Sequence, residues 1–244
     1  MKDVKIEELF NLDKTIAKGI FDGVTYPWEV LPKIKEYILK LGEALSLEEY
    51  EHPSEDIWIS KEAIVFPSAY IAGPCIIDHN AEIRHSAFIR GGVIIGKNAV
   101  VGNSTELKNV ILFDNVQVPH YNYVGDSILG YKAHMGAGAI TSNVKSDKSL
   151  VCIKADDEKI ETGIKKVGAF LGDYAEIGCN SVLCPGSIIG RKSTIYPLSR
   201  VRGVVPSNTI YKNQTEIVER IENYNERCVF NGKIIWYRWS KRNS

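Results

Sequence analysis

The sequence of 244 residues has no long apolar run and no excess of charge of either sign. Its apolar stretches fall far short of the roughly 18 residues that a membrane-spanning helix needs. Thirty basic and thirty acidic residues cancel, so the overall charge gives no reason to expect a nucleic acid or an anionic membrane as a partner. Apolar residues still make up 44% of the chain, which is enough for a substantial core.

Cysteine is also scarce. The five cysteines are Cys75, Cys152, Cys179, Cys184 and Cys228. An odd number of cysteines with no CxxC pair is typical of reduced thiols in a cytoplasm. The first eight residues lack the apolar stretch of a secretory signal peptide. We therefore expect a cytoplasmic protein with reduced thiols.

Aliphatic residues recur every six positions along two stretches of the chain. The first stretch holds Ile59, Val65, Ile71, Ile77, Ile83, Ile89, Ile95, Val101 and Leu107, and the second holds Leu171, Ile177, Leu183, Ile189, Ile195 and Val201. A small residue, such as Ala81 or Ser187, lies four positions after most of them. A helix needs an apolar spacing of 3.6 and an ordinary strand a spacing of 2, so this period fits neither as a long element.

A six-residue period fits a short strand followed by a turn, repeated three times per coil, with each aliphatic residue pointing into a narrow prism. We therefore predict an all-β fold, a parallel β-helix of about seven coils. Three hexads make a coil of about 18 residues, so residues 18 apart should stack on rungs roughly 4.8 Å apart. Each coil buries its aliphatic row only against its neighbours, so the ends need caps.

The segments outside the repeat are expected to supply these caps. Residues 27–42 place Leu31, Ile34, Ile38 and Leu41 at helical spacing, and a weaker helical pattern covers residues 6–20. We therefore predict a helical N-terminal cap over residues 1–55 and the β-helix over residues 56–212.

The C-terminal residues 213–244 are predicted to form a helix and hairpin extension. A polar helix is expected over residues 215–227, and the Asn231-Gly232 pair is a hairpin signal. Between about residues 145 and 165 the hexads give way to charged residues, which predicts a loop inserted into the β-helix. Such loops often carry function.

Arg90 and Lys108 each follow a core aliphatic residue and lie one predicted coil apart, so their side chains should stack on one face. Two cations about 5 Å apart repel each other unless an anion or a carboxylate lies between them. The pair predicts either a phosphate clamp, in which the guanidinium binds bidentately, or a solvated pair relieved by Glu106 or Asp126.

His120 lies in a stretch, residues 118–126, where the hexads are disturbed and aromatic residues replace small ones. A lone histidine is more often structural than catalytic. Histidine is nevertheless the usual base for deprotonating an ammonium group, because it titrates near neutral pH. His120 is therefore a candidate general base.

Several motifs of the chain resemble a known family. The runs GNSTELK at 102–108, PHYNYVGD at 119–126 and MGAG at 135–138 resemble the acetyltransferase domain of bifunctional glucosamine-1-phosphate acetyltransferase/N-acetylglucosamine-1-phosphate uridyltransferases. Residues 165–173 are similar to a stretch shared by archaeal sugar-phosphate nucleotidylyltransferases. The likeness covers roughly residues 57–212, and the intervals from Arg90 to Lys108 and from Lys108 to His120 match without a gap.

This resemblance implies a left-handed parallel β-helix that assembles as a homotrimer, with active sites between adjacent prisms. It implies His120 as the general base, and the backbone N–H of Ala137 as an oxyanion-hole donor to the thioester oxygen. The remaining residues that the resemblance assigns are Arg90, Lys108 and Tyr123 for the substrate phosphate, Lys166 of a neighbouring subunit for the same group, Asn143 for substrate or coenzyme A, and Cys179 for coenzyme A.

The implied reaction is acetyl transfer from acetyl-CoA, without a metal, to the amine of an amino-sugar phosphate such as glucosamine 1-phosphate. This would be a step of UDP-N-acetylglucosamine biosynthesis. Two positions depart from the family, because His134 replaces an asparagine that contacts the sugar and Cys179 replaces a serine. The Gly-rich nucleotide loop of the uridyltransferase domain is not found in residues 1–50, so we expect no uridyltransferase activity.

Three other functions are compatible with the sequence. A metal-dependent hydratase of the carbonic anhydrase type shares the prism and uses histidines, and this chain has His79, His85, His120 and His134. His79 and His85 lie one hexad apart, so they should project from successive faces and not share an ion within one chain. The other two are a catalytically silent trimer that binds a sugar phosphate or a nucleotide sugar, and an N-acyltransferase for a nucleotide-linked amino sugar.

Overall fold

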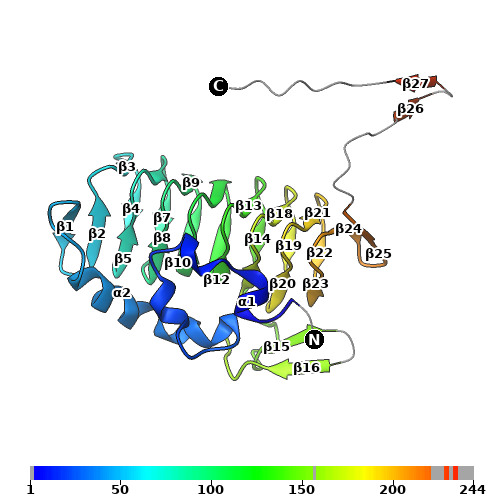
Figure 1. Cartoon of the computed structure of the whole chain (residues 1–244), viewed down its shortest axis with the longest axis horizontal. Coiled ribbons are helices and arrows are strands. Elements are labelled where there is room, and N and C mark those ends of the chain that lie inside the picture. The colour runs from blue at the N-terminus through cyan, green and yellow to red at the C-terminus, as the bar shows by residue number, and fades with distance from the viewer. Residues whose placement is uncertain (1–2, 156–157, 221–227, 231–232, 236–244) are drawn as a thin grey trace.

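A computed structural model describes residues 3–155, 158–220, 228–230 and 233–235. Short strands stack into a three-sided parallel helix of about eight coils. Figure 1 shows it running from β2 (Ile57–Ser60) to β23 (Val204–Val205). The parallel β-helix that the hexads predict is confirmed, with about one coil more than expected.

The three faces of the helix are three stacks of parallel strands. The first face consists of β2, β5 (Cys75–Ile77), β8 (Val93–Ile95), the C-terminal halves of β10 (Glu106–Leu112) and β12 (Tyr123–Leu129), β17 (Ala169–Leu171), β20 (Ser187–Ile189) and β23. The second face consists of β3 (Ile64–Val65), β6 (Glu82–Ile83), β9 (Val100–Asn103), β11 (Gln117–His120), β13 (His134–Met135), β18 (Glu176–Ile177), β21 (Thr194–Ile195) and β24 (Thr209–Asn213). The third face consists of β4 (Tyr70–Ile71), β7 (Phe88–Ile89), the N-terminal halves of β10 and β12, β14 (Ile140–Thr141), β19 (Val182–Leu183) and β22 (Arg200–Val201).

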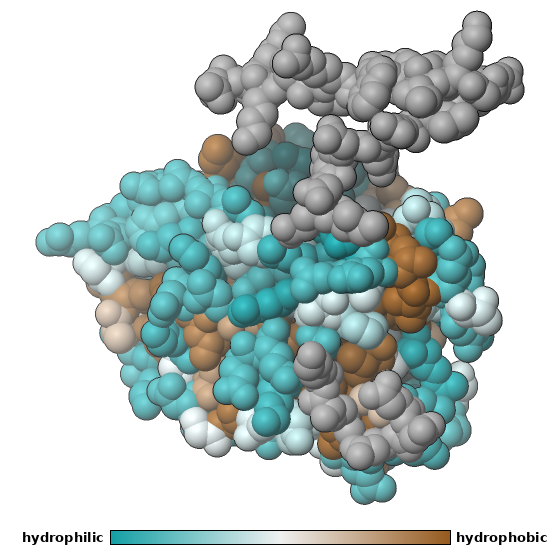
Figure 2. All heavy atoms as spheres, turned by 45° about the vertical axis from the view of Figure 1, so that its right-hand side comes forward, coloured by the Kyte–Doolittle hydropathy of each residue, from teal (hydrophilic) through white to brown (hydrophobic). Residues whose placement is uncertain are grey.

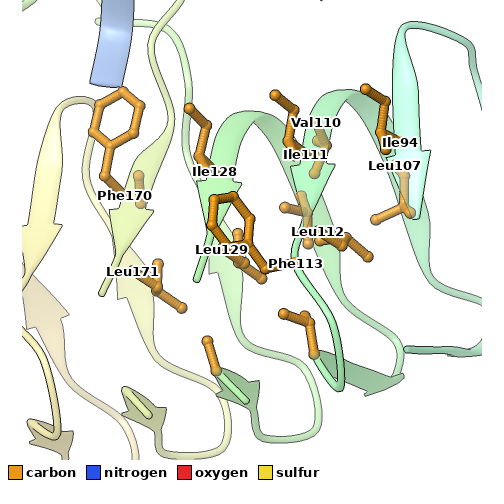
Figure 3. Close-up of a cluster of buried hydrophobic side chains, with 14 of the residues drawn as sticks. Ile94, Leu107, Val110, Ile111, Leu112, Phe113, Ile128, Leu129, Phe170 and Leu171 are labelled. Atoms are coloured by element: carbon orange, nitrogen blue, oxygen red, sulfur yellow. The ribbon is translucent and has the colours of Figure 1, made fainter. Parts of the chain in front are cut away.

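Each coil points aliphatic residues into the prism. Ile77, Leu112 and Leu129 are fully buried, and Figure 3 shows the last two side by side on β10 and β12, which neighbour each other on the first face. The corner between the first and second faces turns through a residue with positive φ, as at Asn80 (55°) and Asn98 (56°). Asparagine tolerates this left-handed conformation better than most residues.

Two coils in the middle of the helix are one residue shorter than the predicted 18-residue coil. Val93 pairs with Val110 and Val110 with Ser127 on the first face, each one position short of that spacing. The full spacing still holds where Ile89 pairs with Leu107. Because these coils are shorter, the six-residue period in the sequence ends at Leu107, although the β-helix itself continues beyond this residue.

Residues 6–43 contain five short helices. They are α1 (Ile6–Leu9), the 3-10 helices η1 (Leu12–Lys14), η2 (Lys18–Phe21) and η3 (Pro27–Lys33), and α2 (Ile34–Glu43). The helix predicted over residues 27–42 is α-helical only from Ile34, because Pro32 inside η3 has no N–H to donate to an α-helical ladder. Of the weaker pattern over residues 6–20, only α1 is a regular α-helix.

This N-terminal segment lies along the first face of the helix, as Figure 1 shows. It begins beside the last coils, where the Ser207 N–H donates to Asp3 Oδ2 at 3.1 Å. Further along, the Asn11 N–H donates to Asp173 Oδ2 at 2.8 Å, and α2 then packs on β5, β8 and β10. The segment that was expected to cap the end of the β-helix therefore covers its side. The N-terminal end of the β-helix is instead paired by β1 (Tyr50–Ser54), which runs antiparallel to β2.

A row of large apolar side chains points outward from the first face beneath this segment. Ile94, Ile111, Ile128 and Phe170 each precede the inward residue of their strand and are fully buried, and Figure 3 shows them in one line. The ring centroid of Phe170 lies 6.1 Å from that of Trp28 in the N-terminal segment. Because the row is removed from water by the segment, the first face is unavailable to other molecules.

The C-terminal end of the helix is paired by β25 (Glu216–Glu219), which runs antiparallel to β24. The polar helix predicted over residues 215–227 is wrong at β25, since pairing there supplies hydrogen-bond partners to the last rung. Residues 221–227 lie outside the described residues. As the hairpin signal predicts, β26 (Cys228–Phe230) and β27 (Lys233–Ile235) pair antiparallel on either side of Asn231-Gly232.

The insertion predicted at about residues 145–165 contains a hairpin of β15 (Cys152–Ala155) and β16 (Glu158–Glu161). Val151 and Ile153 are fully buried, and β15 contacts β23. The hairpin therefore packs on the last coils. Within the described part of the chain, no helix is long and apolar enough to cross a membrane.

Candidate functional site

The corner between the second and third faces carries three of the predicted site residues. His120 is the last residue of β11, and Ala137 and Cys179 lie two residues after the second-face strands of the next two coils. The Gly138 N–H donates to the His120 carbonyl at 3.0 Å, and the Asn180 N–H donates to the Ala137 carbonyl at 2.8 Å. The three residues therefore stack in one column, which we call the corner column, roughly 4.8 Å apart per rung.

The groups that the corner column presents are free to meet a ligand. The His120 side chain is exposed and makes no hydrogen bond to the described residues. Among the backbone hydrogen bonds of the described residues, the Ala137 N–H donates none. The Cys179 thiol is exposed. An exposed imidazole, an unused N–H donor and an exposed thiol thus follow one another along the corner.

Asn122 fixes the turn that carries His120, and sequence reasoning missed it. Its Nδ2 donates to the carbonyls of Gly136 at 2.9 Å and Ala139 at 3.0 Å, and its Oδ1 accepts the His120 N–H at 3.1 Å. Asn122 is only 2% exposed. The sequence did indicate a special role for Asn122. It lies four positions after the inward residue Val118, where most hexads have a small residue.

Arg90 and Lys108 lie on adjacent rungs, since the Arg90 N–H donates to the Leu107 carbonyl at 2.9 Å. Each cation already has a carboxylate partner. Arg90 Nη1 lies 2.7 Å from Glu106 Oε1, and Lys108 Nζ lies 2.9 Å from Asp126 Oδ1. The hydrogen bond that Arg90 donates to the Glu106 carboxylate raises the pKa of Arg90. The ion pairing that the sequence offered as the alternative to an open phosphate clamp is therefore present.

Asp126 is the centre of a buried polar network. Its carboxylate also accepts Asn109 Nδ2 at 3.0 Å and Asn143 Nδ2 at 2.6 Å, and the residue is 3% exposed. Two cations and two carboxylates make this cluster neutral overall. A phosphate that binds here must therefore rely on hydrogen bonds more than on net charge.

Tyr123 supplies one such donor. Asn143 Nδ2 donates to the Tyr123 hydroxyl oxygen at 3.2 Å, so the hydroxyl proton itself is free to be donated to a ligand. Burial raises the pKa of the Tyr123 phenol, and the hydroxyl therefore stays protonated at neutral pH. Tyr123 lies on the third face, immediately after the turn that carries His120.

His134 is not brought together with His120. It pairs across the ladder with Gln117, at the opposite end of the second-face strand from His120. His134 Nδ1 lies 2.8 Å from Glu176 Oε2, and both line a separate cavity of about 380 Å³. The histidine that replaces the family's asparagine is therefore held by a carboxylate.

Lys166 lies on the third-face side of the helix, close to Asn143. Its backbone forms a bridge with Val144, and the following Val167 N–H donates to the Asn143 carbonyl at 3.0 Å. The Lys166 side chain is exposed. It is thus accessible to a ligand or to a neighbouring molecule.

The histidines considered for a metal site are spread over the helix. His79 Nδ1 lies 2.6 Å from Asp78 Oδ1, and His85 Nδ1 lies 3.0 Å from Ser68 Oγ. The described residues contain no group of three or more His, Cys, Asp or Glu residues that could hold a metal ion. A hydratase would need metal ligands from a second chain.

The hexads and the three-sided coil define the chain as a hexapeptide-repeat β-helix protein. The model of the GMPPB C-terminal domain family matches residues 71–170. The bifunctional protein GlmU of Methanococcus maripaludis is 29% identical over 222 residues, which cover 90% of this chain and 54% of the relative. The resemblance inferred from the sequence motifs is confirmed.

Two further proteins are similar to this chain. A bifunctional sugar-1-phosphate nucleotidylyltransferase/acetyltransferase of Sulfurisphaera tokodaii is 34% identical over 94 residues, 38% of this chain and 23% of the relative. The solved structure of the polySia-specific acetyltransferase NeuO is 16% identical with a TM-score of 0.46, over 77% of this chain and 81% of that chain. The chain spans about half the length of the GlmU relative.

Proposed function

We propose that this chain transfers the acetyl group of acetyl-CoA to the amine of an amino-sugar phosphate. The corner column carries the proposal, because it aligns a base, a free backbone N–H and a coenzyme A contact on consecutive rungs. The similarity to bifunctional GlmU and to the nucleotidylyltransferase/acetyltransferase supports it. The proposal assigns acyl transfer, and no uridyl transfer, to the β-helix over residues 56–212.

In the proposed reaction the acceptor amine attacks the carbonyl carbon of the thioester. His120, as the neutral imidazole, takes a proton from the amine as the N–C bond forms. The Ala137 N–H donates to the carbonyl oxygen as it gains negative charge. The C–S bond then breaks, and the thiolate of coenzyme A leaves past Cys179 and takes up a proton.

The acceptor phosphate is assigned to the third face, next to the corner. The Tyr123 hydroxyl and the guanidinium of Arg90, whose side chain is 46% exposed, are the donors best placed to reach it. Lys108 and Asn143 hold the Asp126 carboxylate behind them. Lys166 is assigned to the same group, contributed by a neighbouring copy.

The proposed assembly is a trimer. The first face is covered by the N-terminal segment, so neighbouring prisms must meet through the second and third faces, on either side of the corner column. Closed cyclic assemblies repeat one such contact around a three-fold axis. Light scattering should give three times the monomer mass at micromolar concentration, and a monomer would contradict shared sites.

The decisive experiment is a thiol-release assay with acetyl-CoA and a panel of amino-sugar phosphates, beginning with glucosamine 1-phosphate. Release that depends on the acceptor, with an N-acetylated product by mass spectrometry, is the expected result. No release with any acceptor would favour the catalytically silent binding protein. Release only with nucleotide-linked amino sugars would favour the N-acyltransferase for a nucleotide-linked amino sugar.

A further inference from the structure

A cavity of about 430 Å³ lies between the inserted hairpin and the last coils of the third face. Lys145 and Lys154 line it from the insertion, Ser142 lines it from the residue after β14, and Arg200 and Arg202 line it from β22 and the turn that follows. Figure 2 turns the C-terminal coils forward and shows hydrophilic side chains over much of that end of the molecule. None of the assigned site residues lines this cavity.

The lining is strongly cationic. Four basic side chains face one carboxylate, that of Asp147, which lies 3.8 Å from Lys145 Nζ. Lys154, Arg200 and Arg202 form no ion pair with any described residue. Clustered like charges of this kind repel one another, and an anion among them relieves that repulsion.

The cavity belongs to the same surface as the candidate site. Arg200 pairs across the ladder with Val182, Val182 with Ile140, and Ile140 with Tyr123. Arg200 therefore lies three rungs, roughly 14 Å, from Tyr123 along the third face. The two ends of this face differ in charge. The end at Arg90 is neutralised by carboxylates, whereas the end at Arg200 is not.

The walls of the cavity are fixed by packing. Gly186 has a φ of +79°, and a side chain there would meet Ile153 and Val151 of the insertion at 2.9 Å. Gly203 has a φ of +91°, and a side chain there would meet the Lys154 carbonyl at 2.7 Å. The two glycines let the hairpin lie against the coils. Lys154 is thus held against Gly203, the residue that follows Arg202.

We propose that this cavity binds a phosphate or diphosphate group of a substrate, held by Lys154, Arg200 and Arg202. Guanidinium groups bind phosphate oxygens bidentately, and an ammonium adds a point charge. Binding of the anion is independent of catalysis, whereas its assignment to a substrate rests on the proposed function. The position, along the third face from Tyr123, suits the diphosphate of a nucleotide-linked acceptor or the 3′-phosphate of coenzyme A.

Calorimetric titration of the full chain with inorganic pyrophosphate tests the anion site without turnover. We expect binding that weakens at least tenfold in the Arg200→Gln/Arg202→Gln double variant and in high salt. Lys154→Gln, which changes the inserted hairpin and removes one charge where the double variant removes two, should weaken it by a smaller factor. Arg84→Gln is the matched control, because Arg84 is an ion-paired arginine on the second face, and it should leave affinity unchanged. Equal affinity in wild type and double variant overturns the proposal.

The same variants separate the two sources of phosphate. If the cavity takes the acceptor diphosphate, the double variant loses affinity for UDP and keeps its affinity for coenzyme A. If it takes the 3′-phosphate, the double variant loses affinity for coenzyme A, and wild type binds dephospho-CoA more weakly than coenzyme A. Loss of pyrophosphate binding with no change for either ligand would overturn the substrate assignment. These affinity measurements do not depend on turnover, so they test the cavity even if the acetyl transfer assay is negative.

Discussion

Lys108 Nζ lies 2.9 Å from Asp126 Oδ1, and the Asp126 side chain is only 4% exposed. Lys108 is thus the counter-charge of a buried carboxylate as well as a candidate contact of the substrate phosphate. Removing one partner of a buried pair leaves the other charge unsatisfied, which costs more than losing an exposed pair.

This relationship predicts unequal effects for the two stacked cations. Lys108→Met should lower the free energy of unfolding by about 1–3 kcal/mol, measured by urea denaturation. Arg90→Met, which loses an exposed ion pair with Glu106, should change it far less, because water and salt screen such a pair. Equal losses of unfolding free energy in the two variants would mean that the buried Asp126 carboxylate does not need the charge of Lys108.

His120→Ala should lower turnover in the thiol-release assay by about 10²–10⁴-fold, the range typical of a general base. The melting temperature should hardly change, because the exposed imidazole makes no hydrogen bond to the described residues. His85→Ala is the control, since His85 is also exposed and lies in the same column of the second face, two coils away. Full activity in His120→Ala would rule out the proposed base.

His134→Asn restores the residue found in the glucosamine-1-phosphate acetyltransferase family. We expect activity on glucosamine 1-phosphate to be preserved or raised, because the change removes the pair with Glu176 and leaves the corner column intact. The quantity to compare is kcat/KM for glucosamine 1-phosphate. A loss of activity without a loss of stability would show that His134 itself contacts the substrate.

The cysteines should differ in reactivity toward iodoacetamide. Cys179 is exposed, whereas Cys75 is fully buried and burial raises the pKa of its thiol. Alkylation requires an accessible thiolate, so Cys179 should be labelled in the folded protein and Cys75 only after unfolding. Coenzyme A should slow labelling of Cys179, as followed by peptide mass spectrometry. Labelling of Cys179 at the same rate with and without coenzyme A would remove it from the proposed binding site.

The β-helix was predictable from the sequence because its core obeys a strict local period. Each inward aliphatic residue meets neighbours one coil away, so the same requirement recurs from Ile59 to Leu107. The six-residue period does not predict the stacking where coils are one residue shorter. Val110 and Ser127 still stack there, although they lie 17 residues apart and the hexads have shifted. Strand pairing tolerates a shorter corner when the register on the faces is kept.

The location of the N-terminal segment was not predicted, although the sequence held a signal for it. Hexads of the first face carry a second large apolar residue directly before the inward one, as at Ile94, Ile111 and Phe170. A solvated face would not repeat such residues, so one face had to be covered. The sequence could offer the ion pairs of Arg90 with Glu106 and of Lys108 with Asp126 only as an alternative to an open phosphate clamp. The choice between the two depends on side-chain conformations, which the sequence pattern does not specify.

The side cover has a consequence for how the molecule folds and unfolds. In a solenoid each coil depends on its neighbours alone, so coils can fray one at a time from either end. Here the segment that starts at Asp3 beside Ser207 reaches the first coils through α2, and it bridges distant coils directly. Such long-range contacts favour a single cooperative transition. They also mean that this segment, although it is synthesised before the coils, completes its docking only after the last coil has emerged.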